Sequence, residues 1–200
     1  MNKGYLVTFE GLDGSGKSTM AYRAFKYLSE NMVQCALESE PTSKFKELIV
    51  NDTKLTAEAE AFLFLADRIQ HIEETIKPYL QQGLVVIIDR YMDSTYAYQC
   101  FAGMNKYTSV VETVNKDASI KPDLTFYLDI PVEVSNNRAR VKNKFEYKSD
   151  IYKRNVKNGY DFLAKKEDRF ITIDATKSEE EVWNIIKQHL DEVIAKVKHK

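Results

Sequence analysis

The sequence predicts an α/β fold in which a doubly wound, five-stranded parallel sheet is flanked by helices. Short apolar runs alternate with helical patterns from one end of the chain to the other. One run, Leu84-Val85-Val86-Ile87-Ile88, is apolar at every position, which is typical of a parallel strand covered on both faces. No repeat, low-complexity tract or Pro/Gly-rich linker divides the 200 residues. We therefore predict a single domain over residues 1–200.

Each predicted strand is a short apolar run, and each predicted helix repeats apolar residues at a spacing of three or four. In chain order, the strands are predicted at residues 5–9, 34–38, 84–89, 124–128 and 169–173. The helices are predicted at residues 18–31, 57–80, 132–140, 149–166 and 179–196, with two shorter ones between residues 93 and 118. In a fold of this class, ligands bind at the carboxyl ends of the strands.

The composition is that of an ordinary globular protein, with 44% hydrophobic and 30% charged residues. The net charge of −1 gives no overall attraction to nucleic acid or to a membrane surface. No apolar run approaches the roughly 20 residues of a membrane span, and we expect no signal peptide, because the first predicted strand begins at residue 5. Cys35 and Cys100 are expected to be reduced core thiols, and the histidines show no metal-ligand spacing. We expect a cytoplasmic protein without nucleic-acid or membrane partners.

Residues 11–18, Gly-Leu-Asp-Gly-Ser-Gly-Lys-Ser, match the pattern G-x-x-x-x-G-K-[ST] between a predicted strand and a predicted helix. The glycines let successive backbone N–H groups point at one anion, and the helix N-terminus adds partial positive charge. Lys17 can then reach the β- and γ-phosphates, and the Ser18 hydroxyl can bind Mg²⁺. The pattern predicts a nucleoside triphosphate site rather than a chance glycine-rich turn. Its candidate residues are Gly11, Leu12, Asp13, Gly14, Ser15, Gly16, Lys17, Ser18 and Thr19.

A second polar cluster, beginning at Asp89 and Arg90, follows the predicted strand 84–89. A carboxylate that leaves a buried strand beside a phosphate loop suits Mg²⁺, although Asp89 could instead cap the next helix. Arg90 would face the same crevice, where its planar guanidinium could bind a phosphate or a carboxylate. We therefore assign Asp89 to the metal and Arg90 to an anionic group of a second substrate.

The predicted helix 57–80 carries Phe64 and Arg68, which lie four residues apart and therefore on one face. An aromatic plane beside a guanidinium suits a base that is stacked and hydrogen-bonded at its edge. The alternative is a core residue beside a surface residue, which is the more common reason for this spacing.

The segment from about residue 141 to 149 is polar, weakly periodic and preceded by Arg138 and Arg140. It could be a solvated loop between two helices. It could also be a short mobile lid that excludes water and brings positive charge to the transferring group.

Together these motifs resemble thymidylate kinases, the nucleoside monophosphate kinases that phosphorylate dTMP. The matching blocks follow the family order and are residues 9–18, 40–41, 64–68, 89–99, 122–129 and 173–175. The Asp-Arg-Tyr…Ser…Ala-Tyr-Gln block is far more specific than the phosphate loop. The resemblance implies a P-loop kinase that uses ATP and Mg²⁺ to convert dTMP to dTDP, and a homodimer.

The resemblance also implies roles for individual residues. Asp13 is similar to the carboxylate that faces the sugar 3′-hydroxyl of the monophosphate, Phe64 to the ring that stacks on thymine, and Arg68 to the arginine at the base edge. Arg90 resembles the arginine that grips the monophosphate, and Arg138 the one that contacts the donor nucleotide. The remaining implied acceptor residues are Ser94, Thr95 and Gln99 around the base, and Tyr98 beneath the sugar, where a 2′-hydroxyl would clash.

The chain departs from the family pattern at two positions. Ser39 precedes Glu40-Pro41 where many bacterial relatives have an arginine, so Lys44 is a candidate replacement. Lys144 stands where the lid arginine is expected, and we assign it a catalytic role although lysine lacks the planar fork. We therefore expect a slower enzyme or an altered acceptor choice. The alternatives are a P-loop kinase of other deoxynucleoside monophosphates or of a deoxynucleoside, and a nucleotide-binding regulator with weak catalysis.

Overall fold

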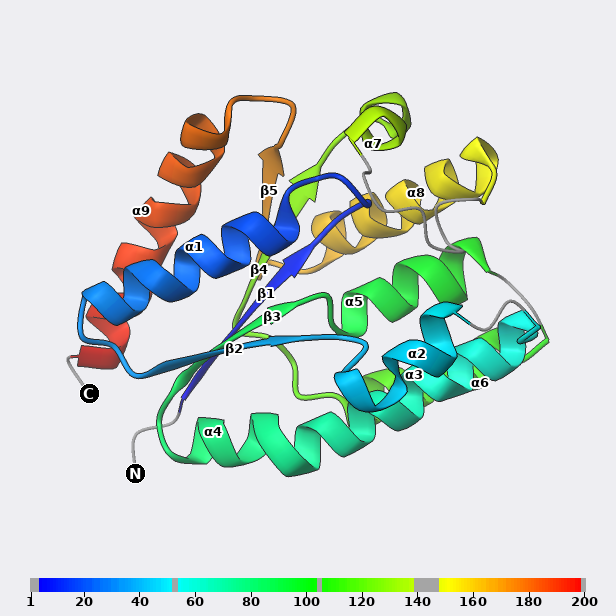
Figure 1. Cartoon of the computed structure of the whole chain (residues 1–200), viewed down its shortest axis with the longest axis horizontal. Coiled ribbons are helices and arrows are strands. Elements are labelled where there is room, and N and C mark those ends of the chain that lie inside the picture. Colours follow the sequence, from blue (N-terminus) through cyan, green and yellow to red (C-terminus); the bar gives the residue numbers. More distant parts are fainter. Residues whose placement is uncertain (1–3, 52–53, 104–105, 139–147, 199–200) are drawn as a thin grey trace.

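The computed structural model describes residues 4–51, 54–103, 106–138 and 148–198. Its centre is a five-stranded, fully parallel sheet with the strand order β2-β3-β1-β4-β5 (Figure 1). The strands are β1 (Tyr5–Glu10), β2 (Cys35–Ser39), β3 (Val85–Asp89), β4 (Leu124–Asp129) and β5 (Phe170–Asp174). This sheet confirms the predicted fold class, and each strand lies within one residue of its predicted position at either end.

Helices connect the strands and cover the sheet. They are α1 (Lys17–Glu30), α2 (Ser43–Asn51), α3 (Ala57–His71), η1 (Ile72–Ile76), α4 (Lys77–Gln81), α5 (Met92–Thr95), η2 (Tyr96–Ala102), α6 (Thr108–Ala118), α7 (Val132–Arg138), α8 (Asp150–Lys166) and α9 (Glu179–Lys198). The single helix predicted at residues 57–80 corresponds to α3, η1 and α4 in succession. η1 and η2 are π-helical, a local widening that is frequent at functional sites and that a 3.6-residue period does not reveal.

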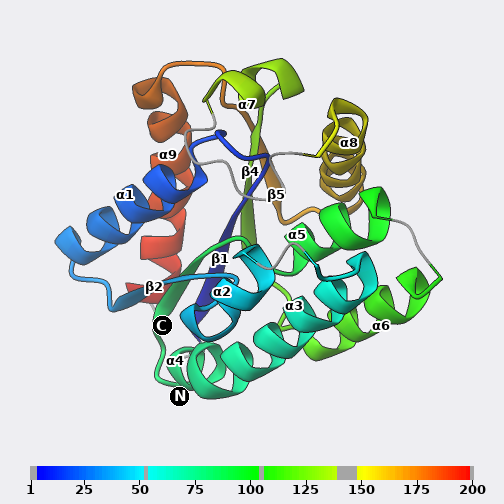
Figure 2. The ribbon, with the colours of Figure 1, turned by 45° about the vertical axis from the view of Figure 1, so that its right-hand side comes forward.

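Alternate residues of the central strands point to opposite faces of the sheet. Phe9 of β1 belongs to the large core cluster that includes Ala24 of α1, whereas Leu6 packs with Ile72 and Ile76 of η1. Figures 1 and 2 show α1 and α9 on one side of the sheet and α3 and α4 on the other. Because both faces are covered, β3 is fully buried from Val85 to Ile88, as its uninterrupted apolar sequence predicts.

Helix α2 was not predicted, because no element was expected between residues 38 and 57. It is nine residues long and packs on α3, with Ile49 fully buried. The backbone N–H of Thr42, just before the helix, donates to Oδ2 of Asp67 on α3 at 2.8 Å. A helix this short depends on such tertiary contacts, which the local sequence pattern does not contain.

Both cysteines are free thiols. Cys100 is buried in η2, as expected of a core residue, whereas Cys35 on β2 is only half-buried. Within the parts of the chain that the structure describes, no helix combines the length and the apolar character that a membrane crossing requires.

Candidate functional site

The two predicted polar clusters meet at the carboxyl edge of the sheet. Phe9 of β1 is paired in register with Asp89 of β3, and the two strands are adjacent. The backbone N–H of Arg90 donates to the Phe9 carbonyl at 3.0 Å, which extends this pairing past the strand end. The phosphate loop (residues 11–18) and the Asp89–Arg90 pair therefore leave the sheet side by side.

The phosphate loop has the backbone that its glycines allow. Gly11 has a φ of 142°, and a Cβ there would lie 2.5 Å from the carbonyl oxygen of Leu128. Lys17 is buried at the start of α1, and its ammonium donates to the Leu12 carbonyl at 2.7 Å. Burial and the positive charge of Arg90 lower the pKa of Lys17 to about 8. The ammonium thus lies folded against the loop that carries it.

Ser18, in the first turn of α1, contacts Asp89 at the end of β3. The Ser18 hydroxyl donates to Oδ2 of Asp89, and Oδ1 of the same carboxylate is buried without a hydrogen-bond partner among the described residues. Helix α5 has Tyr91 as its N-cap residue and no side-chain cap, so the alternative in which Asp89 caps that helix is wrong.

Arg90 connects the phosphate loop to the rest of the site. Its φ of 66° lies in the left-handed region, which is uncommon for a residue with a side chain and is found more often at functional sites. Its guanidinium donates to the Asp13 carboxylate and to the Gly11 carbonyl, the latter at 3.2 Å, and lies 5.3 Å from the centre of the Tyr98 ring. Burial raises the pKa of Asp13, but the charges of Arg90 and Lys17 outweigh it and the pKa is lowered.

Glu10, the last residue of β1, is a buried acid that sequence analysis did not select. Its Oε1 accepts the backbone N–H of Tyr91 at 2.8 Å, and its Oε2 accepts the hydroxyls of Ser94 at 2.6 Å and Tyr160 at 3.0 Å. Burial, together with the nearby charge of Asp93, raises its pKa to about 7. Glu10 therefore fixes the segment that follows Arg90. The signal available in the sequence was a glutamate at the end of an otherwise apolar run.

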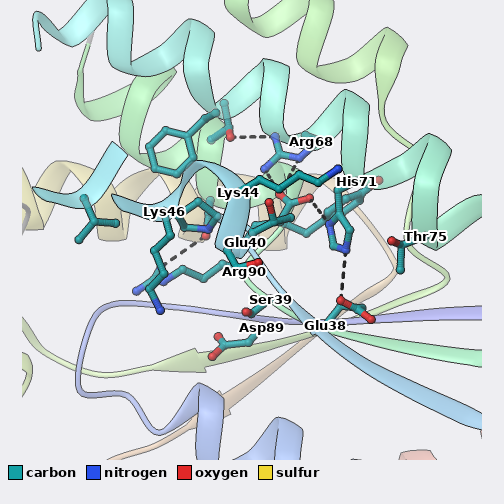
Figure 3. A pocket seen from close by; sticks show the side chains of 18 of the residues that line it. Glu38, Ser39, Glu40, Lys44, Lys46, Arg68, His71, Thr75, Asp89 and Arg90 are labelled. Carbon is teal, nitrogen blue, oxygen red and sulfur yellow. Dashed lines mark hydrogen bonds and ion pairs between the residues drawn. The ribbon is translucent and has the colours of Figure 1, made fainter. Parts of the chain in front are cut away.

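A cavity of about 1020 Å³ opens from this edge of the sheet (Figure 3). Ser18 and Asp89 line it together with all the predicted acceptor residues, which are Asp13, Phe64, Arg68, Arg90, Ser94, Thr95, Tyr98 and Gln99. Lys44 and Lys46 also line it, and Lys44 forms an ion pair with Glu74. Residues that come from two distant blocks of the sequence therefore line one open cavity together with Asp13 and Ser18 of the phosphate loop.

Arg68 is 2% exposed, which excludes the alternative of a surface residue beside a core residue. Its Nε and Nη2 both donate to Oε2 of Glu40, at 2.9 and 2.5 Å. Its Nη1 donates to Oγ1 of Thr95 at 2.8 Å and to Oδ1 of Asn115 at 2.5 Å. A guanidinium has five N–H donors, so these four bonds leave one donor on Nη2.

His71 and its two carboxylate neighbours were not among the predicted site residues. The Nδ1 atom of His71 lies 3.1 Å from Oε1 of Glu40, and Nε2 lies 3.5 Å from Oε2 of Glu38. Burial alone would lower the pKa of His71, but these two carboxylates raise it to about 9. The signal in the sequence that indicates this contact is the position of His71 three residues after Arg68, on the same face of the predicted helix.

The structure does not bring two of the predicted nucleotide contacts to the cavity, each for a different reason. Arg138, at the end of α7, is not among the lining residues, and its guanidinium donates to the carbonyls of Ala175 at 2.7 Å and Thr176 at 3.4 Å after β5. Lys144 and most of the predicted lid fall in residues 139–147, outside the described residues. Both interpretations of that segment therefore stay predictions.

The phosphate loop follows the central strand β1, and the neighbouring strand β3 ends in a carboxylate, Asp89, followed by Arg90. This arrangement defines a P-loop nucleotide-binding domain. The family model described as thymidylate kinase matches residues 9–186. A thymidylate kinase of Thermosipho africanus is 37% identical over 198 residues, covering 92% of this chain and 98% of the relative. One from Aster yellows witches'-broom phytoplasma is 38% identical over 202 residues, covering 94% and 97%. The chain therefore belongs to the thymidylate kinase family.

Proposed function

We propose that this protein transfers the γ-phosphoryl group of ATP to dTMP, giving dTDP and ADP for deoxynucleotide synthesis. Family membership across most of the chain supports this activity. The single structural observation that carries it is the shared cavity, because Ser18 of the phosphate loop and Phe64 and Arg68 of α3 line the same space. A phosphate donor and a base-bearing acceptor can therefore meet there.

The acceptor base is proposed to lie between Phe64 and Arg68. The Phe64 ring would stack on thymine, and the remaining N–H on Nη2 of Arg68 would donate to its edge. Thymine presents the acceptor O4 where cytosine presents an amino donor, so a guanidinium N–H favours thymine over cytosine. Ser94, Thr95 and Gln99 would complete the base pocket, with Tyr98 beneath the deoxyribose.

Charge neutralisation and alignment are proposed to carry the catalysis. The N–H groups of the phosphate loop and the ammonium of Lys17 would hold the β- and γ-phosphates of ATP, while Arg90 would grip the acceptor phosphate. That phosphate is already ionised at neutral pH, so no strong general base is required. Asp13 would orient Arg90 and face the sugar 3′-hydroxyl, and Arg138 would contact the donor nucleotide. Lys144 would supply a further cation from the lid.

The residues at the phosphate loop fit Mg²⁺. Asp89 offers the buried oxygen Oδ1 without a hydrogen-bond partner in the described chain, and the Ser18 hydroxyl lies against Oδ2. The described residues contain no cluster of three or more His, Cys, Asp or Glu side chains arranged for a metal. When bound, Mg²⁺ neutralises charge that develops on the transferred phosphoryl group.

We also propose that the protein is a homodimer that uses the outer face of α2, α3 and α6. Large apolar side chains are exposed there, with Phe62 and Tyr107 in ring contact at 5.9 Å. This apolar face consists of Leu48, Phe62, Ile69, Tyr107 and Val110. A second copy of the chain would cover it, which accords with the dimer that the family resemblance implies.

A substrate panel tests the proposed activity. Release of ADP from ATP is measured with dTMP, dUMP, dCMP, dGMP and thymidine, and dTMP is expected to give the highest kcat/KM. Preference for thymidine or for another monophosphate would transfer the assignment to that acceptor. Tight ATP binding without ADP release for any nucleotide acceptor would instead indicate a regulator.

A further inference from the structure

The carboxylate of Glu40 is held from two opposite sides in the wall of the acceptor cavity (Figure 3). Arg68 donates twice to Oε2, at 2.9 and 2.5 Å, and the Nδ1 atom of His71 lies 3.1 Å from Oε1. All three side chains are at most 3% exposed. Each oxygen of this buried carboxylate therefore has its own cationic partner, and neither oxygen depends on solvent.

The same arrangement continues through His71 to the sheet. Its second ring nitrogen, Nε2, lies 3.5 Å from Oε2 of Glu38 on β2. Carboxylates and cations thus alternate in the order Glu38, His71, Glu40 and Arg68. Glu38 is 28% exposed, but the other three members are buried, and removing one of these leaves a buried neighbour without a partner, which is costly enough to make the neighbour move.

The orientation of the Arg68 fork depends on this series. Thr95 and Asn115 fix Nη1 on one side, and Glu40 fixes Nε and one N–H of Nη2 on the other. The direction of the last N–H on Nη2 is therefore set by where the Glu40 carboxylate lies. With its Oε1 unbonded, Glu40 would be free to rotate, and the plane of the guanidinium would rotate with it.

We propose that His71 is a positioning residue for acceptor recognition, which holds Glu40 so that Arg68 presents one fixed N–H to the acceptor base. His71 acts through Glu40 and Arg68, not by touching the base. This inference rests on the proposed role of Arg68 at the base edge and adds the residue that determines how accurately Arg68 reads it.

The test uses three substitutions of His71 in the full-length protein. In His71→Asn, the side-chain amide can replace Nδ1 as the donor to Glu40. In His71→Gln, the amide takes the place of Nε2 and can contact only Glu38. In His71→Ala, both contacts are lost. We expect the KM for dTMP to rise about tenfold in the Gln and Ala variants, in line with the loss of one buried charged contact. His71→Asn should stay within about threefold of the wild type, since it keeps that hydrogen bond but not its charge. The KM for ATP should be unchanged, and kcat should change less than the KM for dTMP.

A double-mutant cycle separates positioning from general destabilisation. Arg68→Lys removes the planar fork, so His71→Ala should raise the KM for dTMP by less than about threefold in that background. Equal effects of His71→Ala in both backgrounds would overturn the inference. So would loss of rescue by His71→Asn, or an equal loss of kcat and of affinity for both nucleotides. His189→Asn on α9 is the matched control and should leave every constant at the wild-type value.

The cycle also separates this inference from the proposed function. If Arg68 does not read the base, Arg68→Lys itself will leave the KM for dTMP unchanged, and the proposed role of Arg68 fails. If Arg68→Lys impairs dTMP binding but His71→Ala does not, the proposed function stands and the role of His71 is refuted.

Discussion

The guanidinium of Arg90 donates to the carboxylate of Asp13, and this ion pair joins the segment after β3 to the phosphate loop. The two side chains lie 77 positions apart in the sequence and are only 20% and 30% exposed. The proposed donor site and the proposed acceptor site therefore do not form independently. The group that would bind the acceptor phosphate is oriented by a residue of the loop that would bind ATP.

Arg90→Lys should reduce kcat/KM for dTMP by about 10²-fold, because lysine keeps the charge but loses the fork that can hold Asp13 and a phosphate together. Asp13→Asn should cause a smaller loss, since an amide oxygen can still accept from Arg90. Steady-state kinetics with dTMP as the varied substrate measures both. A wild-type kcat/KM in the lysine variant would show that bidentate contact is not required.

Lys17→Ala should lower kcat by at least about 10²-fold, because it removes the cation that is proposed to bind the β- and γ-phosphates of ATP. The fold should persist, since the Lys17 ammonium donates to the Leu12 carbonyl and the Ser15 hydroxyl of its own loop. Turnover is compared with thermal unfolding of the same preparation. Unchanged turnover in a folded variant would refute the role of Lys17.

The parts of the fold and site that follow from local sequence were predicted. The apolar run of β3 and the glycines of the phosphate loop carry their structural requirement within a few residues. The position of Asp89 and Arg90 beside the phosphate loop could also be predicted. Parallel strands bring their carboxyl ends to one edge of the sheet, whatever segments connect them.

The parts that were missed depend on contacts between distant segments. Glu40 and Arg68 are 28 positions apart, and Asn115 comes from a third segment, so no periodicity within one helix indicates that the three meet. The π-helical turns η1 and η2 could not be predicted for another reason. They widen the helix locally, but the spacing of apolar residues in the sequence still fits an ordinary α-helix.

Lys144→Arg tests the departure from the family pattern in the lid. If the lid lacks the planar fork that contacts the transferred phosphoryl group, an arginine at this position should raise kcat by about tenfold or more. Single-turnover measurements isolate the chemical step from product release. No gain would mean that Lys144 is not the catalytic cation of the lid.

The unfolding free energy should depend on pH through His71. Its pKa is about 9 in the folded protein against 6.5 for the free side chain, so the stabilisation is complete below pH 6.5 and is lost as pH rises through 9. A shift of this size corresponds to at most about 3 kcal/mol. Denaturant unfolding of the wild type and of His71→Asn at pH 6.5 and pH 9.5 gives the difference. A wild-type advantage that does not shrink at pH 9.5 would contradict an ionised His71.

Ile69→Glu should dissociate the proposed dimer, because a charge placed on the apolar face of α2, α3 and α6 would have to be buried against the second copy. Ile69 is 43% exposed in the single chain, so the substitution should not disturb the core. Analytical ultracentrifugation over a concentration series gives the assembly state. Ile151→Glu is the matched control, since Ile151 is 71% exposed and lies on α8, which contributes no residue to this face.

If both variants sediment like the wild type, the apolar face of α2, α3 and α6 is not the dimer interface. If only Ile151→Glu becomes monomeric, the interface lies on α8 instead.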